Sequence, residues 1–234
     1  MKRPGADGLR RMLARNHEVA TRTLEPDFPL ASFEALQHWQ RARIQRSFED
    51  VIRRDNYRPA AEFFLRELYG GLDFRERDQD MDRVMPLMIR FLPDGSLATM
   101  AEAFELQAIS LEFDMAMARH MEKASITELD MDRYCEVYRS CSDRPGRERQ
   151  ILLIRKLGYD LDKLVHKRMV SNLVRLMRGP AHVAGLGRLQ DFLETGLQSF
   201  RAMENPHWFI ETVYEREWEA MQRMFAGDER PFGF

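Results

Sequence analysis

Apolar residues recur every three or four positions along almost all of this 234-residue chain, and this spacing constrains the fold more than any other feature. Such spacing places apolar side chains on one face of an α-helix. No segment shows the alternation of apolar and polar residues, bounded by hairpin turns, that is typical of a half-buried strand. Glycine and proline fall mostly between the periodic segments, where they end helices. The sequence therefore predicts an all-α fold.

The periodic segments predict a single compact bundle of about eight to ten helices spanning residues 1–234. A long helix over 97–121 carries apolar residues on two faces, which places it at the centre of the bundle. The helices within residues 9–55 could form a peripheral subdomain. We expect the later helices near residues 127–141, 147–157, 160–178, 180–203 and 206–226.

Several residues are predicted to mark helix starts. Ser32 is a candidate N-cap, because a serine hydroxyl can accept a hydrogen bond from a free N–H group of the first turn. Asn205 followed by Pro206 combines a preferred N-cap with a preferred first helical residue. Carboxylates in a first turn also oppose the positive end of the helix dipole. Three pairs of aspartates are expected to act in this way: Asp80 with Asp82, Asp130 with Asp132, and Asp160 with Asp162.

The composition limits the class of protein. The 36 Lys and Arg residues against 38 Asp and Glu residues give a net charge of −2, which argues against a nucleic-acid partner. No run approaches the ~20 apolar residues that a membrane helix needs, and the N-terminus lacks the apolar stretch of a signal peptide. Cys135 and Cys141 do not have the spacing of a metal or redox motif. We therefore expect a cytoplasmic protein with reduced thiols.

The charge is distributed unevenly along the chain. Residues 133–188 contain 13 Lys or Arg residues against 5 Asp or Glu residues. This region could bind a protein partner or a small anionic ligand, because clustered basic side chains attract and hold carboxylates and phosphates. The candidate residues are Arg144, Arg147 and Arg149 before and at the start of one helix, and Lys163, Lys167, Arg175 and Arg178 on the helix predicted over 160–178. The alternative is a solvated face that pairs with the acidic remainder of the same chain.

The stretch RGPAHVAGLGRLQ, residues 178–190, combines a histidine with three glycines. Pro180 predicts a helix start there, with His182 in the first turn. Glycines within a helix allow close approach of another helix or of a flat cofactor. The first alternative is a tight helix crossing. The second is a haem-binding bundle, similar to haem oxygenases in architecture only, with His182 as ligand and with Gly185, Gly187 and Asp114 near the cofactor.

Asp114 interrupts the apolar surface of the predicted central helix. It could be a functional carboxylate or a structural partner of one of the many arginines. We expect the structural role. An enzyme or a resident cofactor is not expected, because the chain has no His-Glu-x-x-His or Gly-x-Ser-x-Gly motif. Gly185 and Gly187 begin a GxGxxG pattern, but Gln190 replaces the third glycine.

The sequence therefore predicts a non-catalytic helical module that binds through its basic region.

His207 and Glu211 could share one helix face, but two ligands do not make a metal site. The apolar excess on several helices is compatible with a homodimer and equally with burial inside one domain.

Overall fold

A computed structural model gives the structure of the chain, in which residues 2–68, 83–86 and 88–234 are described. These residues form helices and loops without any strand, so the predicted all-α fold is confirmed. In chain order the helices are α1 (Pro4–Thr21), η1 (Arg22–Leu24), α2 (Leu30–Ser47), α3 (Glu49–Ile52), α4 (Arg58–Leu68), α6 (Asp94–Lys123), α7 (Met131–Cys141), α8 (Arg144–Val165), α9 (Arg168–Val183), α10 (Gly187–Arg201) and α11 (Pro206–Ala226). Residues 83–86 and 88–91 are also helical.

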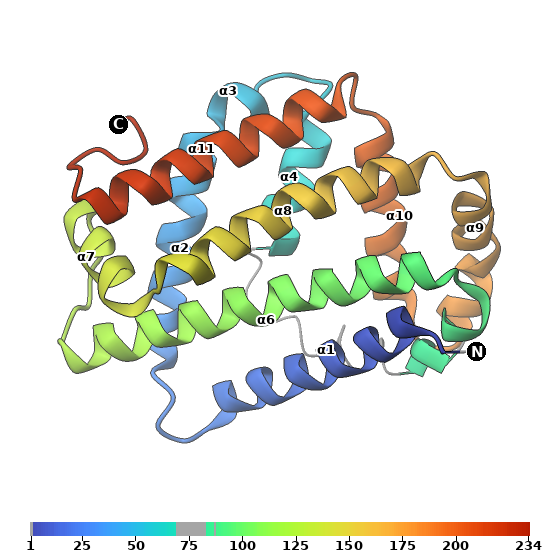
Figure 1. Cartoon of the computed structure of the whole chain (residues 1–234), viewed down its shortest axis with the longest axis horizontal. Helices are drawn as coiled ribbons and strands as arrows, with labels where there is room; N and C mark the ends of the chain where they lie inside the picture. Colours follow the sequence, from blue (N-terminus) through green and yellow to red (C-terminus); the bar gives the residue numbers. More distant parts are fainter. Residues whose placement is uncertain (1, 69–82, 87) are drawn as a thin grey trace.

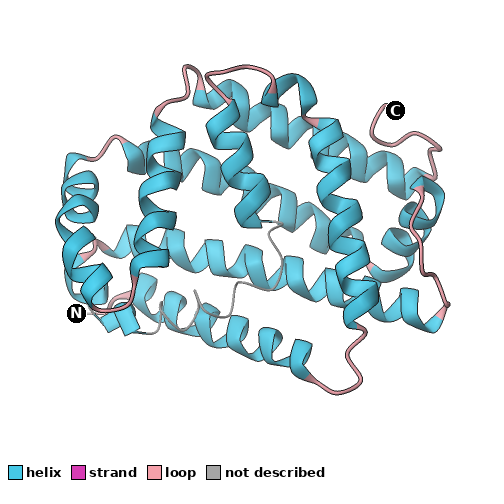
Figure 2. Ribbon diagram, turned by 180° about the vertical axis from the view of Figure 1, so that it is seen from behind, coloured by secondary structure: helices cyan, strands magenta, loops and turns pink. Residues whose placement is uncertain are grey.

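The long helices form two layers. Helices α1, α6, α8 and α11 lie side by side along the long axis of the molecule (Figure 1). Helices α2, α4 and α10 cross them on the opposite side, which Figure 2 shows from behind. The short α7 and α9 lie at the two ends, so α9 is an outermost element that packs on α10 and α8.

Helix α6 is the centre of this arrangement, which confirms the central position predicted for the helix over 97–121. It packs against α1, α2, α7 and α8. Its fully buried residues include Leu97, Ala108 and Met117, and they lie on more than one face of the helix. A helix that is apolar on several sides is stable only when neighbours cover those sides.

Helix α1 is part of the same bundle. Its Leu9 and Leu13 pack with Leu97 and Phe104 of α6 in one apolar cluster. The Asp94 carboxylate accepts hydrogen bonds from the first amides of α1, which would otherwise lack partners. Helix α6 thus caps the element that packs on it.

Two predicted starts are confirmed. The Asp130 carboxylate accepts from the amide of Arg133 at 2.9 Å, and the Asn205 side chain accepts from the amide of Trp208 at 3.0 Å. The predicted Ser32 cap is wrong. Helix α2 begins at Leu30, and the buried Ser32 hydroxyl instead donates to Glu122 of α6 at 2.9 Å.

The expected breaks at Asp160 and Pro180 are also wrong. Helix α8 runs unbroken to Val165, and the Asp160 carboxylate pairs with lysines one turn away on either side. Helix α9 continues through residue 180 and ends near Gly185, whose φ of +75° gives the left-handed turn that follows a helix. The start expected at Asp80 lies outside the described residues.

None of the helices in the described part of the chain is both long enough and apolar enough to cross a membrane.

Candidate anion-binding groove

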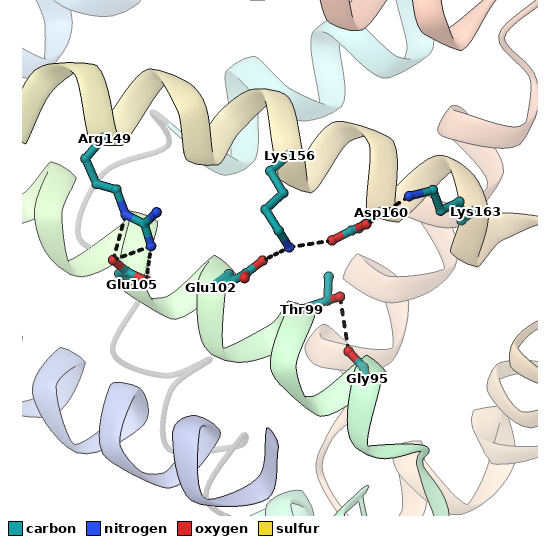
Figure 3. A network of polar contacts seen from close by, with 8 residues as sticks. All are labelled: Gly95, Thr99, Glu102, Glu105, Arg149, Lys156, Asp160 and Lys163. Carbon is teal, nitrogen blue, oxygen red and sulfur yellow. Dashed lines mark hydrogen bonds and ion pairs between the residues drawn. The ribbon is translucent and has the colours of Figure 1, made fainter. Parts of the chain in front are cut away.

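Two basic residues of α8, Arg149 and Lys156, form ion pairs with α6, as Figure 3 shows. The Nε and Nη2 groups of Arg149 donate to the Glu105 carboxylate, with N–O distances of 3.0–3.1 Å. Lys156 contacts Glu102 and lies 2.9 Å from Asp160. Neighbouring carboxylates therefore neutralise Arg149 and Lys156. This agrees with the alternative prediction, a basic face that pairs with acidic residues of the same chain.

Two other candidate residues on α8 also pair with carboxylates. Arg144 donates to Glu148 one turn away at 2.9 Å. The Lys163 ammonium lies 3.5 Å from Asp160. Both side chains are exposed, so these pairs contribute little to stability, but they leave less positive charge for a ligand.

Arg147 lies in the interior. Its guanidinium sits between the rings of Phe113 and Tyr138, 4.0 and 4.2 Å from their centroids. It also donates to the Ser142 hydroxyl at 3.0 Å and to the Met117 sulfur at 3.3 Å. Only 5% of the residue is exposed. Arg147 is therefore not part of a surface site, because a ligand could reach it only if the core opened.

Arg175 and Arg178 line a surface groove between α9 and α10, together with Arg168 and Arg201. Two adjoining cavities of about 230 and 350 Å³ form it and share Ser171, Asn172 and Arg201. The first is also lined by Val165, His166 and Arg168, and the second by Val174, Arg175, Arg178, Glu194, Leu197 and Gln198. Four arginines against one glutamate make the groove strongly basic.

Hydrogen bonds between α9 and α10 fix the wall of the groove. The buried Gln190 amide donates to the Val174 carbonyl and to Glu194, both at 2.7 Å. Arg178 donates to both oxygens of Glu194 at 2.9 and 3.1 Å. These bonds favour the ionised carboxylate, so the pKa of Glu194 lies below its usual value. Arg178 is thus partly neutralised and positions the two helices.

Arg201 fixes the middle of the groove. Its Nε donates to the Val165 carbonyl at 3.1 Å, and its Nη2 donates to the same carbonyl and to the Ser171 hydroxyl. Within the described part of the chain the Nη1 group has no hydrogen bond, although a guanidinium carries five N–H donors. The guanidinium is therefore held in place with donors still available.

Arg168 and Arg175 are the open cations of the groove. Both are exposed, and neither has an ion pair within residues 2–68, 83–86 and 88–234. Lys167 beside the groove is also exposed and unpaired in that part of the chain. Arg168 and Arg175 are seven residues apart, or two helical turns, which separates them by ~10 Å along α9.

The groove contains two residues that the sequence reasoning missed. Arg168 lies seven residues before Arg175, so helical periodicity places both on one face, but Arg168 was not among the predicted candidates. Arg201 lies on another helix, and no local pattern relates it to α9. The groove thus gathers Arg175 and Arg178 from the predicted set, while Arg144, Arg149 and Lys163 lie elsewhere on α8.

His182 does not fit the haem hypothesis. It lies in the last turn of α9, with half of its side chain exposed, and its Nε2 is 3.7 Å from the Asp191 carboxylate. Its ring lies against Gly187, where a Cβ would be 2.6 Å from Nδ1. A haem needs an apolar crevice beside its ligand, but a carboxylate, solvent and this backbone surround His182. Asp114 lies on α6 and accepts a hydrogen bond from Gln40 of α2.

The histidines near the groove do not form a metal centre. His166 and His207 each lie 3.5 Å from a different oxygen of Asp162. Glu211, which shares a face with His207, is occupied by Arg155 and Tyr159. Among the described residues, no three His, Cys, Asp or Glu side chains are arranged to hold a metal ion.

The fold and the groove define a two-layered all-α protein with a basic surface groove at one end. A family model described as "Domain of unknown function (DUF8198)" matches residues 22–231. The chain belongs to this family. The matched range includes both helices of the groove, and α1 precedes it. No curated protein and no solved structure matches the chain.

Proposed function

We propose that this protein is a non-catalytic cytoplasmic binding module that engages an anionic ligand or partner through the groove between α9 and α10. One observation carries the proposal. Arg168 and Arg175 face the groove as exposed cations without an ion pair in the described part of the chain, whereas Arg149 and Lys156 of α8 are neutralised by carboxylates of α6. A guanidinium that is not already paired can bind a carboxylate or phosphate without first losing another partner.

The neighbouring groups support binding to an anion. Arg201 presents further N–H donors, and Ser171 and Asn172 supply polar side chains between the two open arginines. The two cavities form one elongated groove, which suits a ligand with more than one anionic group. Cys135 and Cys141 are free thiols, which is compatible with the cytoplasmic assignment. Burial raises the pKa of the Cys135 thiol to about 11, so this thiol is protonated and unreactive.

Charge reversal tests this proposal. We expect R168E/R175E to weaken binding of pyrophosphate, measured by isothermal titration calorimetry, by at least about tenfold, because two charge-assisted contacts are lost. The affinity of the unaltered protein should fall as salt is added. The matched control is R11E/K123E, which changes the net charge equally at exposed residues of α1 and α6. Equal losses in both variants, or no binding to the unaltered protein, would contradict the proposal.

A further inference from the structure

Helix α9 presents two parallel stripes to solvent. Leu176 is 74% exposed and Val183 is 91% exposed, values that are high for large apolar side chains. They are seven residues apart, as Arg168 and Arg175 are, so each pair spans two helical turns. At 100° per residue, Leu176 and Val183 lie on the flank of α9 next to the arginines. The basic and apolar stripes therefore run side by side.

Nothing in the described part of the chain covers this surface. Helix α9 lies at the end of the molecule and packs on α8 and α10 (Figures 1 and 2). An exposed apolar stripe beside unpaired cations differs from a solvated charged face, which would gain nothing from leucine and valine. A small anion would contact the arginines and leave the apolar stripe uncovered.

We infer that the natural occupant of this surface is an acidic amphipathic helix of a partner protein. This inference rests on the proposed function and names the class of partner. Two carboxylates two turns apart on the partner would meet Arg168 and Arg175. Apolar residues on the adjacent stripe of the partner would cover Leu176 and Val183. Such helix recognition uses anchors at helical spacing, and the opposite charges set the orientation of the partner.

The direct probe is a fluorescently labelled, helix-forming peptide with glutamate and leucine on adjacent stripes. A second peptide has the same composition in a scrambled order, so that the stripes are lost. Fluorescence anisotropy measures binding of each peptide to the full-length protein. The striped peptide is expected to bind at least about tenfold more tightly, since only it can cover both stripes at once.

Substitution of the apolar stripe separates this inference from the proposed function. L176S/V183S should weaken binding of the striped peptide by about tenfold, because two buried aliphatic contacts are lost. Its affinity for pyrophosphate should stay unchanged. The matched control is L24S/L30S, at two other exposed leucines, which should leave both affinities unchanged. All four side chains are exposed, so the variants should remain folded.

Three results would overturn the inference. Equal binding of the striped and scrambled peptides would show attraction by charge alone. An unchanged peptide affinity in L176S/V183S, with pyrophosphate binding still dependent on Arg168 and Arg175, would leave a small-anion groove. Self-association in sedimentation experiments that is lost in L176S/V183S would identify a second copy as the occupant. Failure of the proposed function is distinguishable, because pyrophosphate would then not bind.

Discussion

At the scale of single residues, the interior of the bundle contains a carboxyl group, that of Asp114, whose ionised form is disfavoured by burial. Asp114 of α6 accepts a hydrogen bond from the Gln40 amide at 3.0 Å. Burial raises the pKa of Asp114, although hydrogen bonds from Gln40 and Gln37 and the charge of Arg147 act in the opposite direction. The loss of hydration therefore outweighs the local partners. The expected structural role of Asp114 thus depends mainly on glutamines rather than on an ion pair.

This balance predicts the effect of D114N. A carboxyl group whose pKa is raised by folding contributes stability below its unfolded pKa of ~4, and this contribution is lost as the pH rises through its folded pKa. Asparagine does not titrate, and its carbonyl can still accept from Gln40. D114N should therefore be more stable relative to the unaltered protein at pH 7.5 than at pH 4.5, as measured by urea denaturation. A difference that is independent of pH would contradict this explanation.

At the scale of the helices, glycines permit close crossings. A Cβ on Gly196 of α10 would lie 2.7 Å from the Phe63 ring of α4, and a Cβ on Gly158 of α8 would lie 2.9 Å from Ile210 of α11. A tight helix crossing is therefore found at Gly196, which lies beyond residues 178–190 on α10. Gly185 differs, because it has a positive φ in the turn between α9 and α10.

Alanine substitution distinguishes a packed glycine from an open one. G196A should lower the free energy of unfolding by about 1–3 kcal/mol, because Phe63 is buried and must move. G8A in α1 is the comparison, since its Cβ would meet Ala101 at an ordinary 3.5 Å. It should raise the stability by up to about 1 kcal/mol through helix propensity. Similar effects of the two variants in chemical denaturation would show that packing at Gly196 is not limiting.

At the scale of the whole molecule, arginine–carboxylate pairs connect separate helices. Asp50 of α3 pairs with Arg216 of α11 at 2.7–2.8 Å. Glu211 of α11 accepts from Arg155 of α8 at 2.7 and 2.8 Å. These hydrogen bonds favour the ionised forms, so the pKa values of both carboxyl groups lie below normal. The packing of α11 on α3 and α8 therefore depends partly on ionised carboxylates.

Acid should weaken this assembly. A carboxyl group with a lowered folded pKa contributes stability above its unfolded pKa, and this contribution is lost as the pH falls through the folded pKa. Urea midpoints should therefore fall as the pH is lowered below ~4. E211Q should remove part of this dependence and cost up to about 1 kcal/mol at pH 7, since the pair is partly exposed. E34Q, at an exposed and unpaired residue of α2 in the described chain, should change neither.

Local patterns in the sequence predicted some features of the fold because those features depend on neighbouring residues. The helical period predicted the all-α fold and the central helix, and Asn205 and Asp130 cap the helices that they were expected to start. Asp160 was misjudged because a carboxylate can cap an amide or pair with lysines one turn away. Only the packing of α8 on α6 decides between these roles.

The sequence by itself determined the helical class, the central helix and the basic character of residues 133–188. Only the tertiary structure decided which of these cations are available. It placed Arg147 between two aromatic rings, paired Arg149 with Glu105, and brought Arg201 beside α9. Helical periodicity is a local property of the chain, whereas neutralisation of a charge depends on the distance to a partner that can lie many residues away. A sequence therefore predicts charge, and only the folded chain shows where that charge remains unpaired.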